Sequence, residues 1–239
     1  MANHIVLKTG NNQAQPFAEQ ALLIARSHKD KHNEAKALVI LGLISNYEKN
    51  FTTSQRILRE SQELFQDVHD EWGYANATMA LGSTFWGDED WVTAHLLSQK
   101  AYAGFQKLGD RYFQSVTLRH IGFTSVNLGD STNGIAALRE SLLLAQQLHS
   151  KYEIGWTLWR FAEAARRMDN SIRAARLYEA ARTIFENIGT WWHEDKLELE
   201  KILSACRVEL DEAEFITAIA EGRAMTMEQA VAYALEDQE

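Results

Sequence analysis

Apolar residues recur at helical spacing along most of this chain, and the pattern repeats every forty residues. Three columns carry the repeat: Trp72, Tyr112, Tyr152 and Trp192; Leu41-Gly42, Leu81-Gly82, Ile121-Gly122 and Phe161-Ala162; and Asn50, Asp90, Asp130 and Asn170. Self-similarity at a fixed period is typical of a helical solenoid, in which each unit buries its apolar face against its neighbours. The sequence therefore predicts an all-α fold, a solenoid of antiparallel helix hairpins.

Each forty-residue unit divides into two helices. We predict first helices at 31–48, 71–88, 111–128 and 151–168, and second helices at 51–68, 91–108, 131–148 and 171–188. The short polar side chains of the Asn50 column can cap the helix that follows. The second helices end at Lys29, His69, Gly109, His149 and Gly189, a column suited to the left-handed conformation at a helix C-terminus. The two histidines of that column are therefore predicted to be helix-end residues and not ligands.

Small residues stand where the two helices of a hairpin should cross. They are Gly42, Gly82, Gly122 and Ala162 on the first helices, and Ser54, Ala94, Gly134, Ala174, Ser61, Ala101, Ser141 and Ala181 on the second helices. A glycine in mid-helix costs about 1 kcal/mol relative to alanine. Its return at one position of the repeat therefore indicates that the helices approach each other closely there.

The two ends of the chain depart from the repeat. Residues 1–30 form a partial first unit: a helix that has Pro16 in its first turn runs to about Lys29, and the helix before it is only a stub. This suggests that the array once began further upstream. Residues 191–239 form a terminal cap, because Glu214 and Glu221 replace the small residues of the second helix. We predict cap helices at 192–208 and 211–222, and a last helix to Leu235 that opens with a Thr226–Gln229 capping box.

Composition agrees with a single domain of 239 residues that spans all of these segments, because the repeat runs on without a break in composition. A single proline fits a chain made of helices with short connections. The formal net charge of −9 and the absence of a basic block argue against direct nucleic-acid binding. Cys206 is the only cysteine, and there is no signal peptide or membrane-spanning stretch, so we expect a cytoplasmic protein with no membrane partner.

The small-residue columns resemble those of the tetratricopeptide repeat. The shared features are Leu-Gly on the first helix, a small residue twelve positions after that glycine and another seven positions further on, here in a forty-residue form. The resemblance covers residues 14–190. It implies a right-handed superhelical solenoid whose first helices line a concave binding face.

The closing segment, EGRAMTMEQAVAYAL from Glu221 to Leu235, has a narrower resemblance. It is similar to the end of the repeat region in large bacterial signalling proteins, where such an array follows a STAND-type ATPase module, in some members with a LuxR-type DNA-binding domain. The repeat region of that group is thought to sense an inducer or partner in transcription regulation. This chain has no Gly-x-x-x-x-Gly-Lys-Ser/Thr phosphate loop and no helix-turn-helix after Leu235. The resemblance therefore implies the sensor portion alone, or a stand-alone relative of it.

The predicted concave wall contains a candidate binding site. Its groove-facing positions lie six and three residues before, and one and four residues after, the small residue of each first helix. Those we select are Asn76, Met79, Ser83, Trp86, Arg119, Phe123, Trp156, Trp159, Glu163 and Arg166. Aromatic residues and arginine dominate binding hot spots. The sequence therefore predicts that a ligand or partner binds on this wall.

Two alternatives stay open for these residues. Aromatic residues at helical spacing also occur in cores, so Trp156 or Trp159 could pack under the terminal cap. Arg119 and Arg166 could pair with Glu163 or meet an anionic group of a ligand. If Arg119 and Trp159 face a ligand, replacing both should abolish binding with little loss of thermal stability.

The residues give no support for catalysis. The eight histidines are scattered without ligand spacing, and no nucleophile, base and orienting group come together, so we expect no enzyme activity, metal or cofactor. Our first hypothesis is a non-catalytic sensor or protein-interaction module. Its partner would be a protein or peptide, the adjacent ATPase domain of a parent chain, or a small effector. The alternative is a structural scaffold that associates with itself as a homo-oligomer through an apolar face at its N-terminal end.

Overall fold

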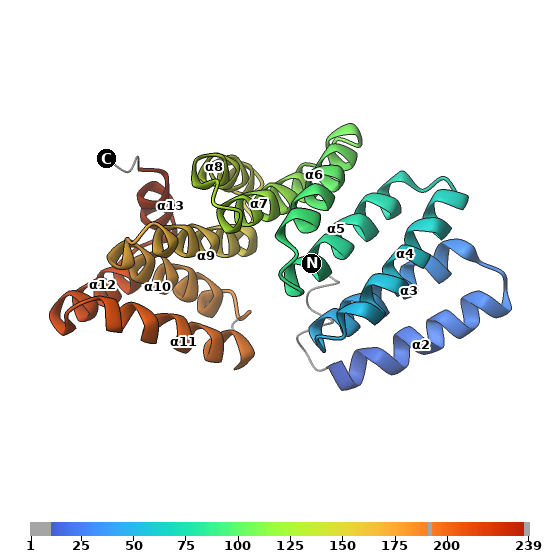
Figure 1. Cartoon of the computed structure of the whole chain (residues 1–239), viewed down its shortest axis with the longest axis horizontal. Coiled ribbons are helices and arrows are strands. Elements are labelled where there is room, and N and C mark those ends of the chain that lie inside the picture. Colours follow the sequence, from blue (N-terminus) through green and yellow to red (C-terminus); the bar gives the residue numbers. More distant parts are fainter. Residues whose placement is uncertain (1–10, 191–192, 237–239) are drawn as a thin grey trace. The chain divides into compact units, whose positions relative to one another are not determined.

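The computed structural model describes residues 11–190 and 193–236, and within these it contains twelve helices and no strand (Figure 1). Ten of the helices have seventeen residues each: α2 (Asn11–Ser27), α3 (Lys31–Tyr47), α4 (Phe51–Asp67), α5 (Glu71–Gly87), α6 (Trp91–Lys107), α7 (Arg111–Asn127), α8 (Ser131–Gln147), α9 (Lys151–Arg167), α10 (Ser171–Asn187) and α11 (His193–Glu209). Two shorter helices follow, α12 (Glu212–Ala224) and α13 (Met227–Leu235). None of the helices in these ranges is long and apolar enough to cross a membrane.

The predicted all-α helical repeat is confirmed. The helices of the predicted hairpins pack together as pairs, α3 with α4, α5 with α6 and α9 with α10. Neighbouring hairpins also contact each other, through α4 and α5 and through α8 and α9. The predicted helices 31–188 begin at the observed residues and end within one residue of them. By their contacts the helices fall into two compact units, residues 1–113 and 114–239, and α7 begins in the first and continues in the second.

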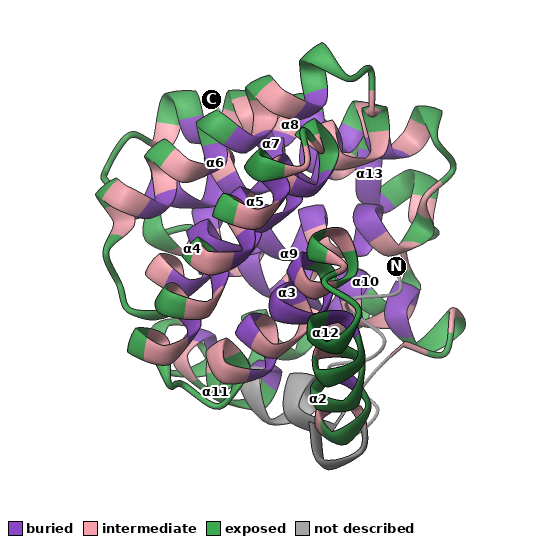
Figure 2. Cartoon of the chain, turned by 90° about the vertical axis from the view of Figure 1, so that its right-hand side faces the viewer, coloured by how far each residue is buried: buried purple, intermediate pink, exposed green. Residues whose placement is uncertain are grey.

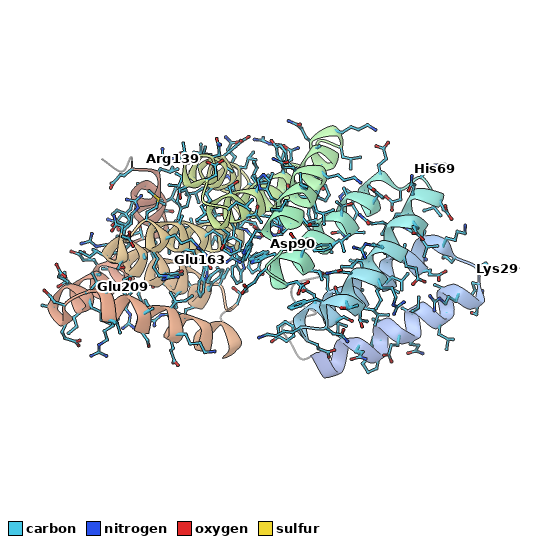
Figure 3. The ribbon with its side chains drawn as sticks, in the orientation of Figure 1. Lys29, His69, Asp90, Arg139, Glu163 and Glu209 are labelled. Atoms are coloured by element: carbon cyan, nitrogen blue, oxygen red, sulfur yellow. The ribbon has the colours of Figure 1, made fainter. Side chains whose placement is uncertain are left out.

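One turn geometry connects all the helices from α2 to α10. A residue with positive φ, between 51° and 86°, stands two positions after the end of each helix: Lys29, Lys49, His69, Glu89, Gly109, Gly129, His149, Asp169 and Gly189. At the α3–α4 turn the backbone N–H groups of Lys49 and Asn50 donate to the carbonyls of Asn46 and Ser45, which is the Schellman pattern. The side chain of Asn50 then caps α4 by accepting from the Thr53 N–H. Figure 3 labels Lys29 and His69 in two of these turns.

The predicted crossings of small residues are also present. Ser54 is buried and donates to the carbonyl of Gly42 at 2.8 Å, and Ala94, Ala162 and Ala174 are fully buried. At the α7–α8 crossing, a Cβ on Gly122 would lie 2.8 Å from the Gly134 carbonyl oxygen. Real Cβ atoms do not approach backbone that closely, so this crossing requires glycine.

The N-terminal helix differs from its prediction. Pro16 was expected in the first turn, but α2 begins at Asn11, so the proline lies inside the helix. A proline removes one helical hydrogen bond, and the helix nevertheless extends a further turn towards the N-terminus. Figure 2 shows that most of the α2 surface is exposed.

The C-terminal cap is built on α10. The helix α12 packs mainly against α10 through Ala218 and Gly222, and a Cβ on Gly222 would meet the backbone of Arg176. Glu221, which was predicted to end the stack, forms an ion pair with Arg176 at this contact. The predicted capping box of Thr226 opens α13. The cap helices therefore fold back onto the last complete hairpin.

Arg173 of α10 holds the far end of α13. This side chain is buried, and its guanidinium donates to the carbonyls of Tyr233 and Ala234 at 2.8 and 3.1 Å. It also lies over the ring of Tyr233, 4.7 Å from its centroid. A cation at a helix C-terminus satisfies carbonyls that have no partner within the helix and interacts favourably with the helix dipole. This contact fixes α13 against α10.

The crossings predict different costs for the same substitution at two glycines. Gly122→Ala should lower the free energy of unfolding by about 1–3 kcal/mol, because the new Cβ meets backbone that cannot move aside. Gly82→Ala should change it by less than about 1 kcal/mol, because its Cβ would lie 3.3 Å from Leu97 Cβ and 3.5 Å from the Ala94 carbonyl, and alanine favours the helix. Urea denaturation of both variants measures the difference. Equal stabilities would contradict the close crossing.

Candidate functional site

The candidate residues on α5 lie in the first unit. Asn76 is buried, and Met79, Ser83 and Trp86 are half-buried. Met79 packs against the cluster of Ala75, Ala101 and Phe105. The hydroxyl of Ser83 donates to the Met79 carbonyl at 3.2 Å, which is a bond within the helix. These side chains therefore contribute to the packing of α5 as well as to its surface.

Arg119 of α7 forms a buried ion pair within the second unit. Only 8% of Arg119 and 2% of Glu153 are exposed, and the Arg119 Nε lies 3.3 Å from Glu153 Oε2. The sequence predicts Glu163 or a ligand as its partner. The partner in the structure is Glu153, which lies in the first turn of α9 beside α7. Removing either partner would leave a buried charge without compensation, so this pair is tied to stability.

The two tryptophans of α9 belong to an aromatic cluster. Trp159 is 2% exposed and meets Tyr178 of α10 edge-on, with ring centroids 5.2 Å apart. Trp156 is half-buried and lies 5.9 Å from Trp159 and 5.0 Å from Phe185. A joint substitution of Arg119 and Trp159 would therefore disturb the core, and it cannot separate binding from stability.

An arginine that was not predicted connects the remaining candidates. The guanidinium of Arg160 lies over the ring of Phe123, 4.1 Å from its centroid, and donates to Glu163 at 2.6 Å. The cation–π contact and the ion pair together fix the orientation of the guanidinium. Glu163, labelled in Figure 3, is half-buried, so this assembly of α7 and α9 reaches the surface of the second unit.

Arg166 stands one turn beyond Glu163 and is also half-buried. Its charge acts on two buried groups nearby. Burial raises the pKa of Tyr178 well above its ordinary value and the Glu163 carboxylate adds to this, while Arg160 and Arg166 oppose it. Burial likewise raises the pKa of the Cys206 thiol, and Arg166 again opposes the shift. Both groups therefore stay neutral at physiological pH, and the charges available at this surface are those of the arginines and Glu163.

Two residues of this site were missed by the sequence analysis. Arg160 lies three residues before Glu163, a spacing that brings charged side chains together on a helix, and this signal could have been used. Tyr178 lies on a second helix, outside the positions considered for the wall. Its hydroxyl is buried and has no hydrogen-bond partner among the described residues. Only the packing of α10 against α9 reveals it.

The arrangement provides recognition chemistry. It combines a fixed guanidinium, a half-buried carboxylate, a second arginine and the edge of an aromatic cluster. Within residues 11–190 and 193–236, no group of three or more histidine, cysteine, aspartate or glutamate side chains could hold a metal ion. Neither a protein-family model nor a curated protein matches the sequence.

Proposed function

We propose that this chain is a non-catalytic binding module that recognises a protein or peptide through the first helices of its second unit. One observation carries the proposal, the assembly of Phe123, Arg160 and Glu163 beside the half-buried Arg166. Arginines next to aromatic rings are typical of the centres of protein interfaces. A partner that brings a carboxylate and an apolar side chain would match the arginine and the aromatic edge together.

The repeat supports a more specific form of the same proposal. The small-residue crossings and the helical hairpins fit a TPR-like array, a class in which stacked repeats present extended binding surfaces. The segment Glu221–Leu235, which resembles the end of the repeat region in bacterial STAND-type ATPase and LuxR-type regulators, forms the last turn of α12 and all of α13. On this proposal the chain is the cytoplasmic sensor part of such a signalling or transcription regulator. An adjacent ATPase domain would then be a natural partner, and a small effector a second one.

Adjacent arginines at the end of α9 give a matched test. We would select peptides against the wild-type chain from a random library and measure the Kd of the best binder by calorimetry. Arg166→Gln should weaken binding about tenfold or more, because it removes a partly desolvated charge from the site. Arg167→Gln makes the same change at an exposed side chain whose guanidinium bonds to Asn127, and should leave the Kd nearly unchanged.

Thermal denaturation of both variants is the control, and the two melting temperatures should be close to that of the wild type. Selected peptides that bind the Arg166→Gln variant as tightly as the wild type would refute the proposed site. A selection that yields no binder would count against the binding function itself.

A self-associating scaffold remains the second candidate, because α2 exposes large apolar side chains. Phe17, Leu23 and Ile24 are 73%, 70% and 51% exposed. Phe17 and Ile24 lie seven residues apart, so they share one face of the helix. A contiguous exposed apolar face on a helix commonly marks an interaction site.

Light scattering over a concentration series tests this candidate. If α2 mediates self-association, the mean mass of the wild type should rise with concentration, and the variant Phe17→Gln with Ile24→Gln should stay monomeric. Val208→Gln is the control, since Val208 is 88% exposed on α11 of the other unit. A wild-type chain that remains monomeric at all concentrations would exclude the scaffold.

A further inference from the structure

A groove of about 470 Å³ lies on the first unit between the second helices α4 and α6, with α5 as its floor. Phe65 of α4, Tyr74 and Ala75 of α5, and Gly104 of α6 give it an apolar lining, and Lys100 of α6 stands at its wall. Small-molecule sites have volumes of this size. The polar part of the lining consists of Gln66, His69, Asp70, Glu71, Thr78 and Lys107. The groove shares no residue with the candidate site on the first helices.

The repeat provides a reference for what closes such a groove. Forty residues earlier along the chain, Arg26 of α2 reaches across α3: its Nε donates to Glu34 at 2.7 Å and its Nη2 donates to Glu60 of α4 at 2.8 Å. Leu64 of α4 packs against the cluster that contains Ala35. In that position of the repeat, an ion-pair bridge and a leucine side chain occupy the space between the second helices.

Every one of these groups is replaced in the α4–α6 groove. Gln66 stands in the place of Arg26, Tyr74 in the place of Glu34 and Lys100 in the place of Glu60. Gly104 stands in the place of Leu64. The bridge is lost because Lys100 would now face a neutral Gln66, and the leucine side chain is gone. A Cβ at Gly104 would lie 3.0 Å from Ala75 Cβ, so the glycine also lets α6 lie close to α5. The groove beside this contact is lined by Gly104 and by the exposed Lys100.

The corresponding residues of the second unit are buried. There, Ala180 and Ile184 of α10 stand in the places of Lys100 and Gly104, and both are buried. Ile184 places a side chain at the position where Gly104 has none. Among these equivalent positions, the combination of a glycine and a lysine is confined to α6.

Lys100 is held in place without an acidic partner. Its ammonium donates to the Tyr74 hydroxyl at 2.7 Å and lies 5.0 Å from the centroid of the Tyr74 ring. Within the described residues no carboxylate pairs with it, whereas Lys107, at the rim of the same groove, pairs with Glu71 at 2.7 Å. A fixed cation beside an apolar lining favours a ligand that carries one negative charge on an apolar body.

We propose that the α4–α6 groove binds a small organic carboxylate, with the carboxylate on Lys100 and the apolar body over Phe65, Ala75 and Gly104. Asp70 and Glu71 also line the groove, and their negative charges disfavour a dianionic phosphate. A carboxylate carries a single charge that one lysine neutralises. The site would let the repeat respond to an acidic metabolite.

The test compares two aromatic probes of the same shape. 2-Naphthoate and its neutral analogue 2-naphthamide are titrated into the full chain, and binding is followed by backbone amide NMR shifts. We expect 2-naphthoate to give saturable shifts in α4, α5 and α6 around the groove, and 2-naphthamide to bind about tenfold more weakly, since it lacks the charge-assisted bond.

Three variants locate the contact. Lys100→Met should weaken 2-naphthoate binding about tenfold and leave 2-naphthamide binding unchanged. Gly104→Leu, which restores the residue of the preceding repeat, should abolish binding of both probes. Lys36→Met removes the same charge from α3, at a residue that is exposed like Lys100 but does not line the groove, and should have no effect. If Gly104→Leu does not fold, the Lys100 and Lys36 pair still decides.

Three results would overturn the proposal. They are equal affinity for the two probes, shifts that map outside the groove or do not saturate, and a Lys100→Met variant that binds 2-naphthoate like the wild type. None of these results bears on the peptide site of the second unit, because the two sites use different helices.

Discussion

The structure depends on one backbone constraint, a turn that recurs every twenty residues. In the turns from α2 to α10 a residue in the left-handed region follows one helix, and the next residue along the chain caps the following helix. Because a turn of three residues recurs every twenty residues, each helix between two turns has seventeen residues. Equal helices keep the forty-residue columns in register. Small residues of the two helices therefore stand at the crossings of the hairpins between residues 31 and 188.

Regularity of this kind makes the exceptions informative. Where the columns hold, as at Gly122 and Gly134, the residues serve packing. Where they break, the side chains gain other contacts. Arg160 stands where the earlier first helices carry Ile40, Ala80 and His120, and it joins Phe123 to Glu163. Gly104 and Lys100 break their columns in the first unit and line a groove. Both proposed sites lie at departures from the repeat.

Most of the fold could be predicted from the sequence, because its determinants are local and repeated. The small residues predicted the crossings, and the short polar residues predicted the caps. Left-handed residues within the hairpins, such as Lys49, Glu89 and Asp169, gave no such signal, since lysine and glutamate rarely adopt positive φ. They adopt this conformation within the turn, where the N–H of each donates to a carbonyl of the preceding helix.

The candidate site was less predictable, because it depends on which helices meet. A face of a helix can be predicted from spacing, but burial depends on the neighbour. Trp159 was placed on the concave wall, and the structure buries it against Tyr178 of α10. Arg119 of α7 pairs with Glu153 of α9, which lies 34 residues further along the chain. The packing of α12 onto α10 through Gly222 likewise has no counterpart in the repeat pattern.

The most direct measurement of the central constraint is the stability of a substitution series at Gly129. This residue has φ of +86°, and a Cβ there would meet nothing within 4 Å, so any cost must come from the backbone conformation. Asparagine tolerates the left-handed region better than alanine does. The account predicts that Gly129→Ala lowers the free energy of unfolding by about 1–2 kcal/mol and Gly129→Asn by clearly less. An alanine variant as stable as the wild type would contradict it.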